Sequence, residues 1–220
     1  MNAATGTGKY EQLLARCQGL PPVVAAVAHP CDASSLAGAA EAHQHGLIEP
    51  LLVGPAAKIA SAAKAAGIDL KDLEIIDTPH SHAAAAKAVE LVREGRAEIL
   101  MKGSLHTDEF MGAIVAREGG LRTGRRVTHA FIMDVPTYHK VLIVTDGAIN
   151  IAPTLEDKVD ICQNAIDLAI ALGLAKPKVA ILAAVETVTS KMPATIDAAD
   201  RKSTRLNSSH QSVSRMPSSA

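Results

Sequence analysis

The chain has 220 residues, of which 48% are hydrophobic, and a formal net charge of -1 from 22 basic and 23 acidic side chains. This length allows one large or two small domains, and the balanced charge lacks the basic surface expected of a nucleic-acid-binding protein. Cys17, Cys31 and Cys162 lack the CxxC spacing of a zinc site, and no apolar stretch is long enough for a leader or a membrane span. We expect a cytoplasmic protein with no metal site and no nucleic-acid or membrane partner.

Short β-branched segments alternate with alanine-rich amphipathic segments in the first half of the chain. The strands are predicted over residues 23–28, 51–53, 73–76 and 98–101. The helices are predicted over residues 34–45, 56–66, 82–94 and 108–117. This alternation is typical of a parallel sheet with helices on both faces. The sequence therefore predicts an α/β fold with a three-layer, doubly wound sheet.

The second half departs from strict alternation. Strands over residues 128–133 and 140–145 are separated by a turn-like stretch, which predicts an antiparallel hairpin. Thr154 is a good N-cap for the next helix, Asp157 stands three residues later, and Gly173 ends the helix. Helical spacing predicts a buried stripe of Val159, Cys162, Ile166 and Ile170.

The end of the chain changes in composition. A strand over residues 178–185 would open a second α/β domain, whereas residues 201–220 contain seven Ser and no apolar periodicity. We expect an N-terminal domain over residues 1–173, the start of an incomplete second domain over residues 174–200, and a disordered, non-native tail over residues 201–220.

The loop after the strand at residues 98–101 carries the densest group of chemically useful side chains. In open α/β sheets, ligands bind beyond the carboxyl ends of the strands. Backbone amides at a helix N-terminus favour an anion, and Lys102 adds a positive charge, so phosphate is the natural ligand. The alternative is an ordinary turn in which Thr107 or Asp108 caps the helix. The candidate ligand-binding residues of this loop are Lys102, Gly103, Ser104, His106 and Thr107.

Two further loops offer weaker signals. Asp146 and Asn150 precede a helix and could orient a ligand, although both residue types are common in turns. Arg122 belongs to an arginine- and glycine-rich loop that could clamp a phosphate or could simply be solvated. Cys31 follows His29 at a strand end, but a nucleophilic Cys/His pair needs an oriented base that spacing does not show.

Four motifs in order and spacing resemble the phosphate acetyl/butyryltransferase family, most closely the transferase part of bifunctional enoyl-CoA hydratase/phosphate acetyltransferases. They are Leu100-Met101-Lys102-Gly103 with His106-Thr107, Gly120-Leu121-Arg122-Thr123, Thr145-Asp146-Gly147-Ala148-Ile149-Asn150-Ile151-Ala152-Pro153-Thr154, and Ala184-Val185-Glu186 leading to Lys191-Met192-Pro193-Ala194-Thr195. The resemblance covers residues 10–199.

The resemblance implies a two-domain architecture like that of isocitrate dehydrogenase, a homodimer, and reversible acyl transfer between an acyl phosphate and coenzyme A, with release or uptake of inorganic phosphate. Coenzyme A would be a substrate, and no tightly bound cofactor is expected. The loop from Asp146 through Asn150 and Pro153 would line the substrate cleft with the Lys102 loop. The catalytic residues of the family lie beyond the stretch that matches, so we expect this chain to be inactive or impaired and name no catalytic residue. A non-catalytic module that binds coenzyme A or a nucleotide is the alternative.

Overall fold

The computed structural model describes residues 8–185 and 187–199. By its internal contacts the chain divides into two compact units between Thr123 and Gly124. The parallel-sheet unit runs from Leu14 to Thr123, and the hairpin unit contains the described residues up to Leu13 and from Gly124 onward. Residue 173, near which we placed an approximate domain boundary, lies in the hairpin unit, just after the helix at Leu155–Ala171 that packs on the hairpin. That boundary stays a prediction.

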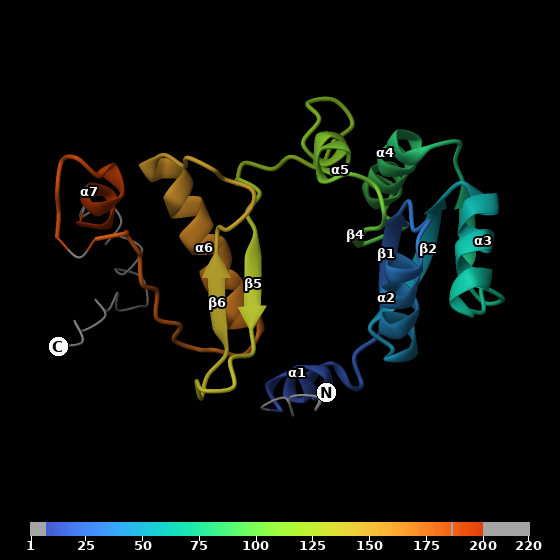
Figure 1. Cartoon of the computed structure of the whole chain (residues 1–220), viewed down its shortest axis with the longest axis horizontal. Coiled ribbons are helices and arrows are strands. Elements are labelled where there is room, and N and C mark those ends of the chain that lie inside the picture. Colours follow the sequence, from blue (N-terminus) through green and yellow to red (C-terminus); the bar gives the residue numbers. More distant parts are fainter. Residues whose placement is uncertain (1–7, 186, 200–220) are drawn as a thin grey trace. The chain divides into compact units, whose positions relative to one another are not determined.

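Four parallel strands form the sheet of the parallel-sheet unit, in the order β3-β2-β1-β4. They are β1 (Val23–Ala28), β2 (Ile48–Gly54), β3 (Glu74–Asp77) and β4 (Ile99–Lys102). Three of them, β1, β2 and β4, are labelled in Figure 1. The carboxyl halves of the two central strands, β1 and β2, are buried. Near-continuous apolar runs are typical of parallel strands whose two faces are both covered.

Helices cover both faces of this sheet. The helices α2 (Ala33–Gln44) and α3 (Ala56–Ala66) lie on one face, and α4 (Ser81–Arg93) and α5 (Thr107–Ile114) lie on the other. Successive side chains of a strand point to opposite faces, so the residues of β1 are shared between two cores. One core contains Val27, Leu36, Ala39, Leu52, Ile59 and Ala63, and the other contains Ala26, Ala28, Leu51, Val53, Ala84, Ala85, Ala88 and Leu91. The predicted three-layer α/β arrangement is confirmed for this unit.

The hairpin unit is built on two antiparallel strands, β5 (Ala130–Met133) and β6 (Leu142–Thr145), as the sequence predicted. The long helix α6 (Leu155–Ala171) packs against β6 and begins with a capping box between Thr154 and Asp157. A short helix, α7 (Pro193–Ala199), is linked to α6 by an ion pair between Lys158 and Asp197. The first helix, α1 (Lys9–Cys17), begins in this unit, where the buried Lys9 ammonium binds the Asp134 carboxylate at 2.9 Å.

Several local predictions were wrong. Residues 178–185 form no strand, because no neighbouring strand among the described residues pairs with them, and Leu182 is 74% exposed. The buried stripe of α6 includes Ile161 and Ala169, whereas Ile170 is half-exposed. The N-cap of α5 is His106, not Thr107 or Asp108. The sequence analysis also missed the helices α1 and α7.

The tail that we assigned to residues 201–220 lies outside the described residues. Within the described ranges, no helix combines the length and the apolar character needed to cross a bilayer. Over the same ranges, His, Cys, Asp and Glu side chains do not gather in groups of three or more that could hold a metal ion.

Candidate functional site

The loops that follow β1 and β4 lie next to each other at the carboxyl edge of the parallel sheet. β1 and β4 are neighbours in the sheet, and Ala28, the last residue of β1, pairs with Lys102, the last residue of β4. His29 and Cys31, which follow β1, therefore contact Ser104, which follows β4. This edge is where ligands bind in open α/β sheets.

Gly103 lets these two loops come into backbone contact. Its N–H donates to the Ala28 carbonyl at 2.9 Å. A Cβ atom at this position would lie 2.5 Å from the carbonyl oxygens of both Ala28 and His29. Only glycine fits without movement of the backbone. The close approach that Gly103 permits is thus to the chain's own strand β1.

Ser104 ties the two loops together through its hydroxyl group. Its Oγ donates to the His29 carbonyl at 2.8 Å, lies 3.2 Å from the His29 Nδ1 atom, and accepts from the Cys31 amide at 3.3 Å. The Ser104 amide also donates to the His29 carbonyl, at 2.9 Å. This serine, predicted as a ligand-binding residue, is engaged with its own protein at every hydrogen-bonding position of the hydroxyl.

The ionisable groups at this edge have perturbed acidities. Burial, reinforced by Lys58, lowers the pKa of His29, although Glu109 and Asp32 oppose the shift. Burial raises the pKa of the Cys31 thiol, which therefore stays protonated near neutral pH. Because the His29 Nδ1 atom faces Ser104, these two properties do not favour a nucleophilic Cys/His pair.

The positive side of the site consists of Lys102 and the N-terminus of α5. Lys102 is exposed, and its ammonium group lies 3.3 Å from the Gly103 carbonyl. His106 is the N-cap of α5 but its side chain accepts no capping hydrogen bond, so the first amides of the helix keep their capacity to bind an anion. The exposed Thr107 hydroxyl begins the same helix.

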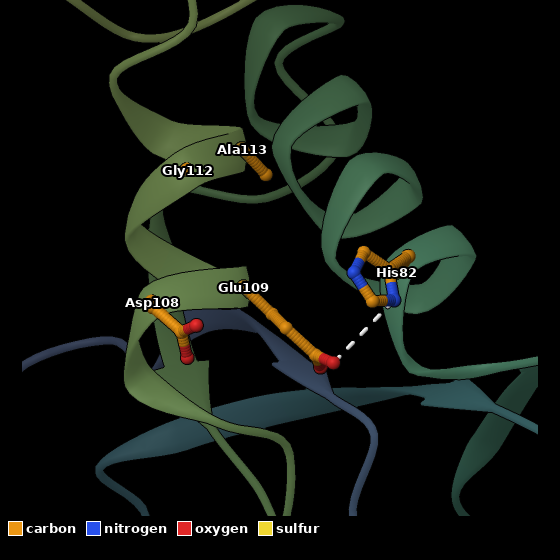
Figure 2. Close-up of a pocket in the computed structure, with 5 residues that line it drawn as sticks. All are labelled: His82, Asp108, Glu109, Gly112 and Ala113. Carbon is orange, nitrogen blue, oxygen red and sulfur yellow. Dashed lines mark ion pairs between the residues drawn. The ribbon is translucent and has the colours of Figure 1, made fainter.

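The acidic residues in the first turn of α5 border a hollow on the surface (Figure 2). Glu109 points toward α4, where its Oε1 atom lies 3.4 Å from the His82 Nδ1 atom. The other Glu109 oxygen is buried without a hydrogen-bond partner among the described residues. Asp108, Gly112 and Ala113 complete the lining. The Glu109 charge is thus directed to the α4 side of the helix.

The Asp146 loop of the hairpin unit is organised by its own side chains. The carboxylate of Asp146 accepts hydrogen bonds from the amides of Ala148 at 3.0 Å, Ile149 at 2.9 Å and His129 at 3.1 Å, and from the Asn150 side chain at 2.6 Å. Burial alone would raise the pKa of Asp146, but these four bonds together hold it well below its usual range. The carboxylate is therefore a fixed negative charge that shapes the loop.

Asn150 is committed in the same way, because its amide nitrogen also donates to the Val127 carbonyl at 3.1 Å and its oxygen accepts from Arg126 at 3.1 Å. Pro153 is half-buried and directly precedes Thr154, the N-cap of α6. The three predicted residues of this loop, Asp146, Asn150 and Pro153, thus set the path of the chain into α6. Their contact with a ligand stays a prediction.

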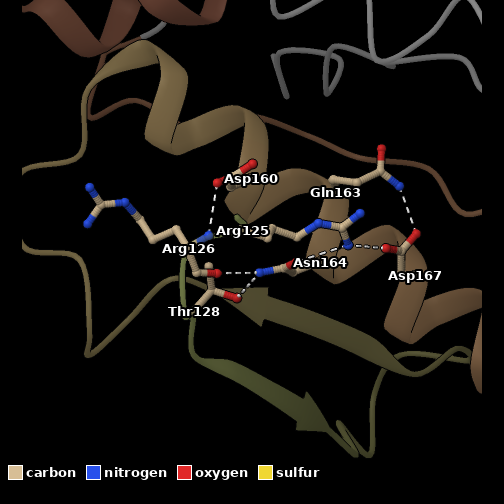
Figure 3. Close-up of polar contacts among 7 residues, drawn as sticks. All are labelled: Arg125, Arg126, Thr128, Asp160, Gln163, Asn164 and Asp167. Carbon is tan, nitrogen blue, oxygen red and sulfur yellow. Dashed lines mark hydrogen bonds and ion pairs between the residues drawn. The ribbon is translucent and has the colours of Figure 1, made fainter. Parts of the chain in front are cut away.

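The two arginines after Thr123 are bound to α6 (Figure 3). Arg125 contacts the Asp167 carboxylate at 2.5 Å. The Arg126 guanidinium contacts Asp157, also on α6, at 2.6 Å. The Asn164 side chain, on the same helix, donates to the Arg126 carbonyl at 3.0 Å. Arg122 is exposed and forms no ion pair within the described ranges, so it is the arginine of this loop whose guanidinium stays open to an anion.

The predicted site residues lie in two separate groups, and the structure adds His29 to the first of them. Lys102, Gly103, Ser104, His106 and Thr107 lie in the parallel-sheet unit at one edge, whereas Asp146, Asn150 and Pro153 belong to the hairpin unit. The sequence analysis did not assign His29 to the Lys102 loop. The signal that could have found it is that β1 and β4 both end where a ligand would bind, once their adjacency is known.

Comparisons with known proteins show the family to which the chain belongs. Residues 80–211 match the family model described as phosphate acetyl/butaryl transferase, so the match passes residue 201, where we expected the tail to begin. The chain is 60% identical to the phosphate acetyltransferase of Rhizobium meliloti over 191 residues, which is 87% of this chain and 60% of that protein. It is 40% identical to the phosphate butyryltransferase of Clostridium acetobutylicum over 174 residues, covering 79% of this chain and 58% of that protein.

Among solved structures, a branched-chain phosphotransacylase from Enterococcus faecalis V583 superposes with a TM-score of 0.71 at 25% identity. The superposition covers 87% of this chain and 67% of that one. This chain therefore spans roughly 55 to 60% of the length of the first curated relatives that it matches.

Proposed function

Since the chain belongs to the phosphate acetyl/butyryl transferase family, we propose that it carries the phosphate-binding part of an enzyme that transfers an acyl group reversibly between an acyl phosphate and coenzyme A. The acyl phosphate, inorganic phosphate and coenzyme A are its substrates and products in this proposal. Coenzyme A acts as a substrate and not as a resident cofactor.

The observation that carries this proposal is that two anion-binding groups follow β4 at the carboxyl edge of the parallel sheet. Lys102 supplies a full positive charge, and the first amides of α5 lack a side-chain cap. The Thr107 hydroxyl adds a hydrogen-bond donor. A phosphoryl group at this position would be held by a charge-assisted hydrogen bond and by the helix dipole.

The proposed reaction makes defined demands on such a site. The thiol of coenzyme A loses its proton and attacks the acyl carbonyl, the carbon–sulfur bond forms, and the carbon–oxygen bond to phosphate breaks. Phosphate leaves with the electron pair of that bond, so negative charge builds up on the leaving group as the reaction proceeds. Lys102 and the α5 amides stabilise this charge. We assign no catalytic base among the described residues.

The same proposal includes a cytoplasmic location and a homodimeric assembly of the intact protein. All three cysteines, Cys17, Cys31 and Cys162, are free thiols, which suits a reducing compartment. The alternative of a non-catalytic module that binds coenzyme A or a nucleotide is not favoured, because the relatives are named as acyltransferases.

To test the proposal, calorimetry measures the binding of acetyl phosphate and butyryl phosphate to the purified 220-residue chain. A second assay measures the formation of acyl-coenzyme A after coenzyme A is added. Replacing Lys102 by alanine removes a charge-assisted contact, so affinity should fall by about tenfold or more. Lys64→Ala, on the exposed face of α3, is the matched control and should bind as the unaltered chain does. Equal affinity of the Lys102→Ala variant would contradict the proposed site, and binding of coenzyme A without any binding of an acyl phosphate would support the non-catalytic alternative.

A further inference from the structure

We propose that His29 is a positioning residue for this phosphate site: its Nδ1–H group donates to the Ser104 hydroxyl and thereby fixes the loop between β4 and α5 against strand β1. Only the expected effect on phosphate affinity rests on the proposed function. The hydrogen bond itself follows from the geometry of the two loops.

Proton accounting at Ser104 decides the direction of the bond. A serine hydroxyl has one proton to donate and two lone pairs to accept with. The hydroxyl proton is directed at the His29 carbonyl, 2.8 Å away. The hydroxyl oxygen also lies 3.3 Å from the Cys31 amide, whose hydrogen it shares with the His29 carbonyl at 2.9 Å. Because the serine proton is already engaged, we infer that the His29 Nδ1 atom, 3.2 Å away, carries a hydrogen and acts as the donor.

The environment of His29 makes this assignment specific to one tautomer. Burial and the neighbouring Lys58 on α3 lower the pKa of His29, whereas Glu109 on α5 and Asp32 at the start of α2 raise it. The net effect keeps the imidazole neutral near pH 7, with a single ring hydrogen. Because Ser104 requires that hydrogen on Nδ1, the Nε2 atom is left as the unprotonated nitrogen.

The backbone of His29 shows why this contact is needed. His29 is the one non-glycine residue among the described residues with a left-handed conformation, at φ 53°. This bend turns its carbonyl toward three donors: the Ser104 amide, the Cys31 amide and the Ser104 hydroxyl. An unfavourable backbone conformation persists only where surrounding contacts hold it in place, and such residues are found often at functional sites. The contact between the His29 ring and Ser104 is a further contact that holds this conformation.

Ser104 stands between the two groups that bind the anion. Lys102 lies two residues before it, and the N-cap of α5, His106, lies two residues after it. A loop released from His29 would let the Lys102 ammonium and the α5 amides drift apart. Misplacement on the scale of an ångström weakens polar recognition substantially, even where the fold is retained. Loss of the bond should therefore lower phosphate affinity more than it lowers stability.

Two substitutions of His29 separate positioning from direct contact. His29→Asn keeps a side-chain N–H donor near the place of Nδ1, tolerates the left-handed conformation, and lacks Nε2. His29→Gly tolerates the same backbone conformation but has no donor. Calorimetry of the 220-residue chain with acetyl phosphate should show affinity within about twofold of the unaltered chain for the asparagine variant and a loss of about tenfold for the glycine variant.

The ring nitrogens of His29 give a readout that does not depend on ligand. Nitrogen–proton correlation spectra of the unaltered chain should show the neutral tautomer with hydrogen on Nδ1. In Ser104→Ala, where the acceptor is gone, the population should shift toward the Nε2–H tautomer. A dominant Nε2–H tautomer in the unaltered chain, or spectra that Ser104→Ala leaves unchanged, would overturn the inference.

The binding results discriminate further. Equal affinity of the glycine variant overturns a positioning role, and equal losses in the asparagine and glycine variants overturn it in favour of direct contact through Nε2. If the unaltered chain binds no acetyl phosphate at all, the proposed function fails, while the tautomer measurement still decides whether the bond between His29 and Ser104 exists.

Discussion

Replacing Gly103 by alanine introduces a methyl group where the backbones of two loops touch. The new Cβ atom would lie 2.5 Å from the carbonyl oxygens of Ala28 and His29 and 2.7 Å from the His29 carbonyl carbon. All three atoms belong to the backbone, so no flexible side chain can turn away. The loop after β4 must move by roughly 1 Å to restore a van der Waals distance of about 3.5 Å.

The magnitude follows from what that movement disturbs. Overpacking against fixed atoms costs about 1–3 kcal/mol. The hydrogen bonds from Gly103 to Ala28 and from Ser104 to His29, both 2.9 Å long, would be stretched, at about 1 kcal/mol each. The lower entropy of the unfolded alanine chain returns about 0.5–1 kcal/mol. Together these terms predict that Gly103→Ala destabilises the parallel-sheet unit by about 2–4.5 kcal/mol.

Gly112→Ala is the matched control, because a Cβ atom added at Gly112 meets no atom within 4 Å and the residue lies inside α5. Alanine in a helix interior should stabilise by about 0.5–1 kcal/mol. Hydrogen exchange of the His29 amide, which donates to the Val53 carbonyl at 2.7 Å, reports on the parallel-sheet unit, and urea unfolding followed by circular dichroism gives the global value. If Gly103→Ala were as stable as the unaltered chain by both measures, the close approach of the two loops would not exist in solution.

Asp146→Asn leaves one side-chain oxygen to accept from the four groups that now donate to the carboxylate. We expect the free energy of unfolding to fall by about 2–3 kcal/mol, a value already reduced for the partial exposure of the loop. Hydrogen exchange of the His129 amide should become faster. Because the folded pKa of Asp146 is depressed, its stabilising contribution is complete above about pH 3.9 and is lost as the pH falls from there toward the folded pKa; acid unfolding of the asparagine variant should lack this component. Thr154→Ala removes the N-cap of α6 and should cost about 1 kcal/mol, measured by urea unfolding, whereas a negligible change would show that the capping box contributes nothing. Leu91→Ala empties a fully buried position on α4 and should cost about 2–5 kcal/mol in the same assay; a smaller effect would mean that the core closes over the space.

Several helices and strands could be predicted because the sequence patterns that favour them are local. The strand at Val23–Ala28 and the helix at Ala56–Ala66 have the bounds that periodicity indicated. The capping box at Thr154 and Asp157 is a three-residue pattern that acts within one turn. Residues 178–185 carried an equally good strand pattern, but a strand exists only with a neighbour to pair with, and spacing along the chain does not supply one.

The candidate site shows the same division between local and distant information. The chemistry of Lys102, the N-terminus of α5 and the requirement for a small residue at Gly103 are legible in seven consecutive positions. The roles of Ser104 and Asp146 could not be predicted from the sequence. A hydroxyl or carboxylate that is free to bind a ligand and one that is fully hydrogen-bonded within the protein look the same in the sequence.

By itself, the sequence determined the α/β class, the hairpin, the phosphate-compatible loop at Lys102 and the family. These properties depend on periodicity, on helix termini and on motif order, all of which act over short stretches of chain. Only the tertiary structure decided that β1 and β4 are neighbours, and hence that His29 and Ser104, 75 positions apart, share a hydrogen bond. It also decided that the Asp146 carboxylate is saturated by hydrogen bonds from its own protein. The physical reason is that hydrogen-bond saturation depends on which distant atoms come within about 3 Å of one another, and the order of residues does not specify that distance.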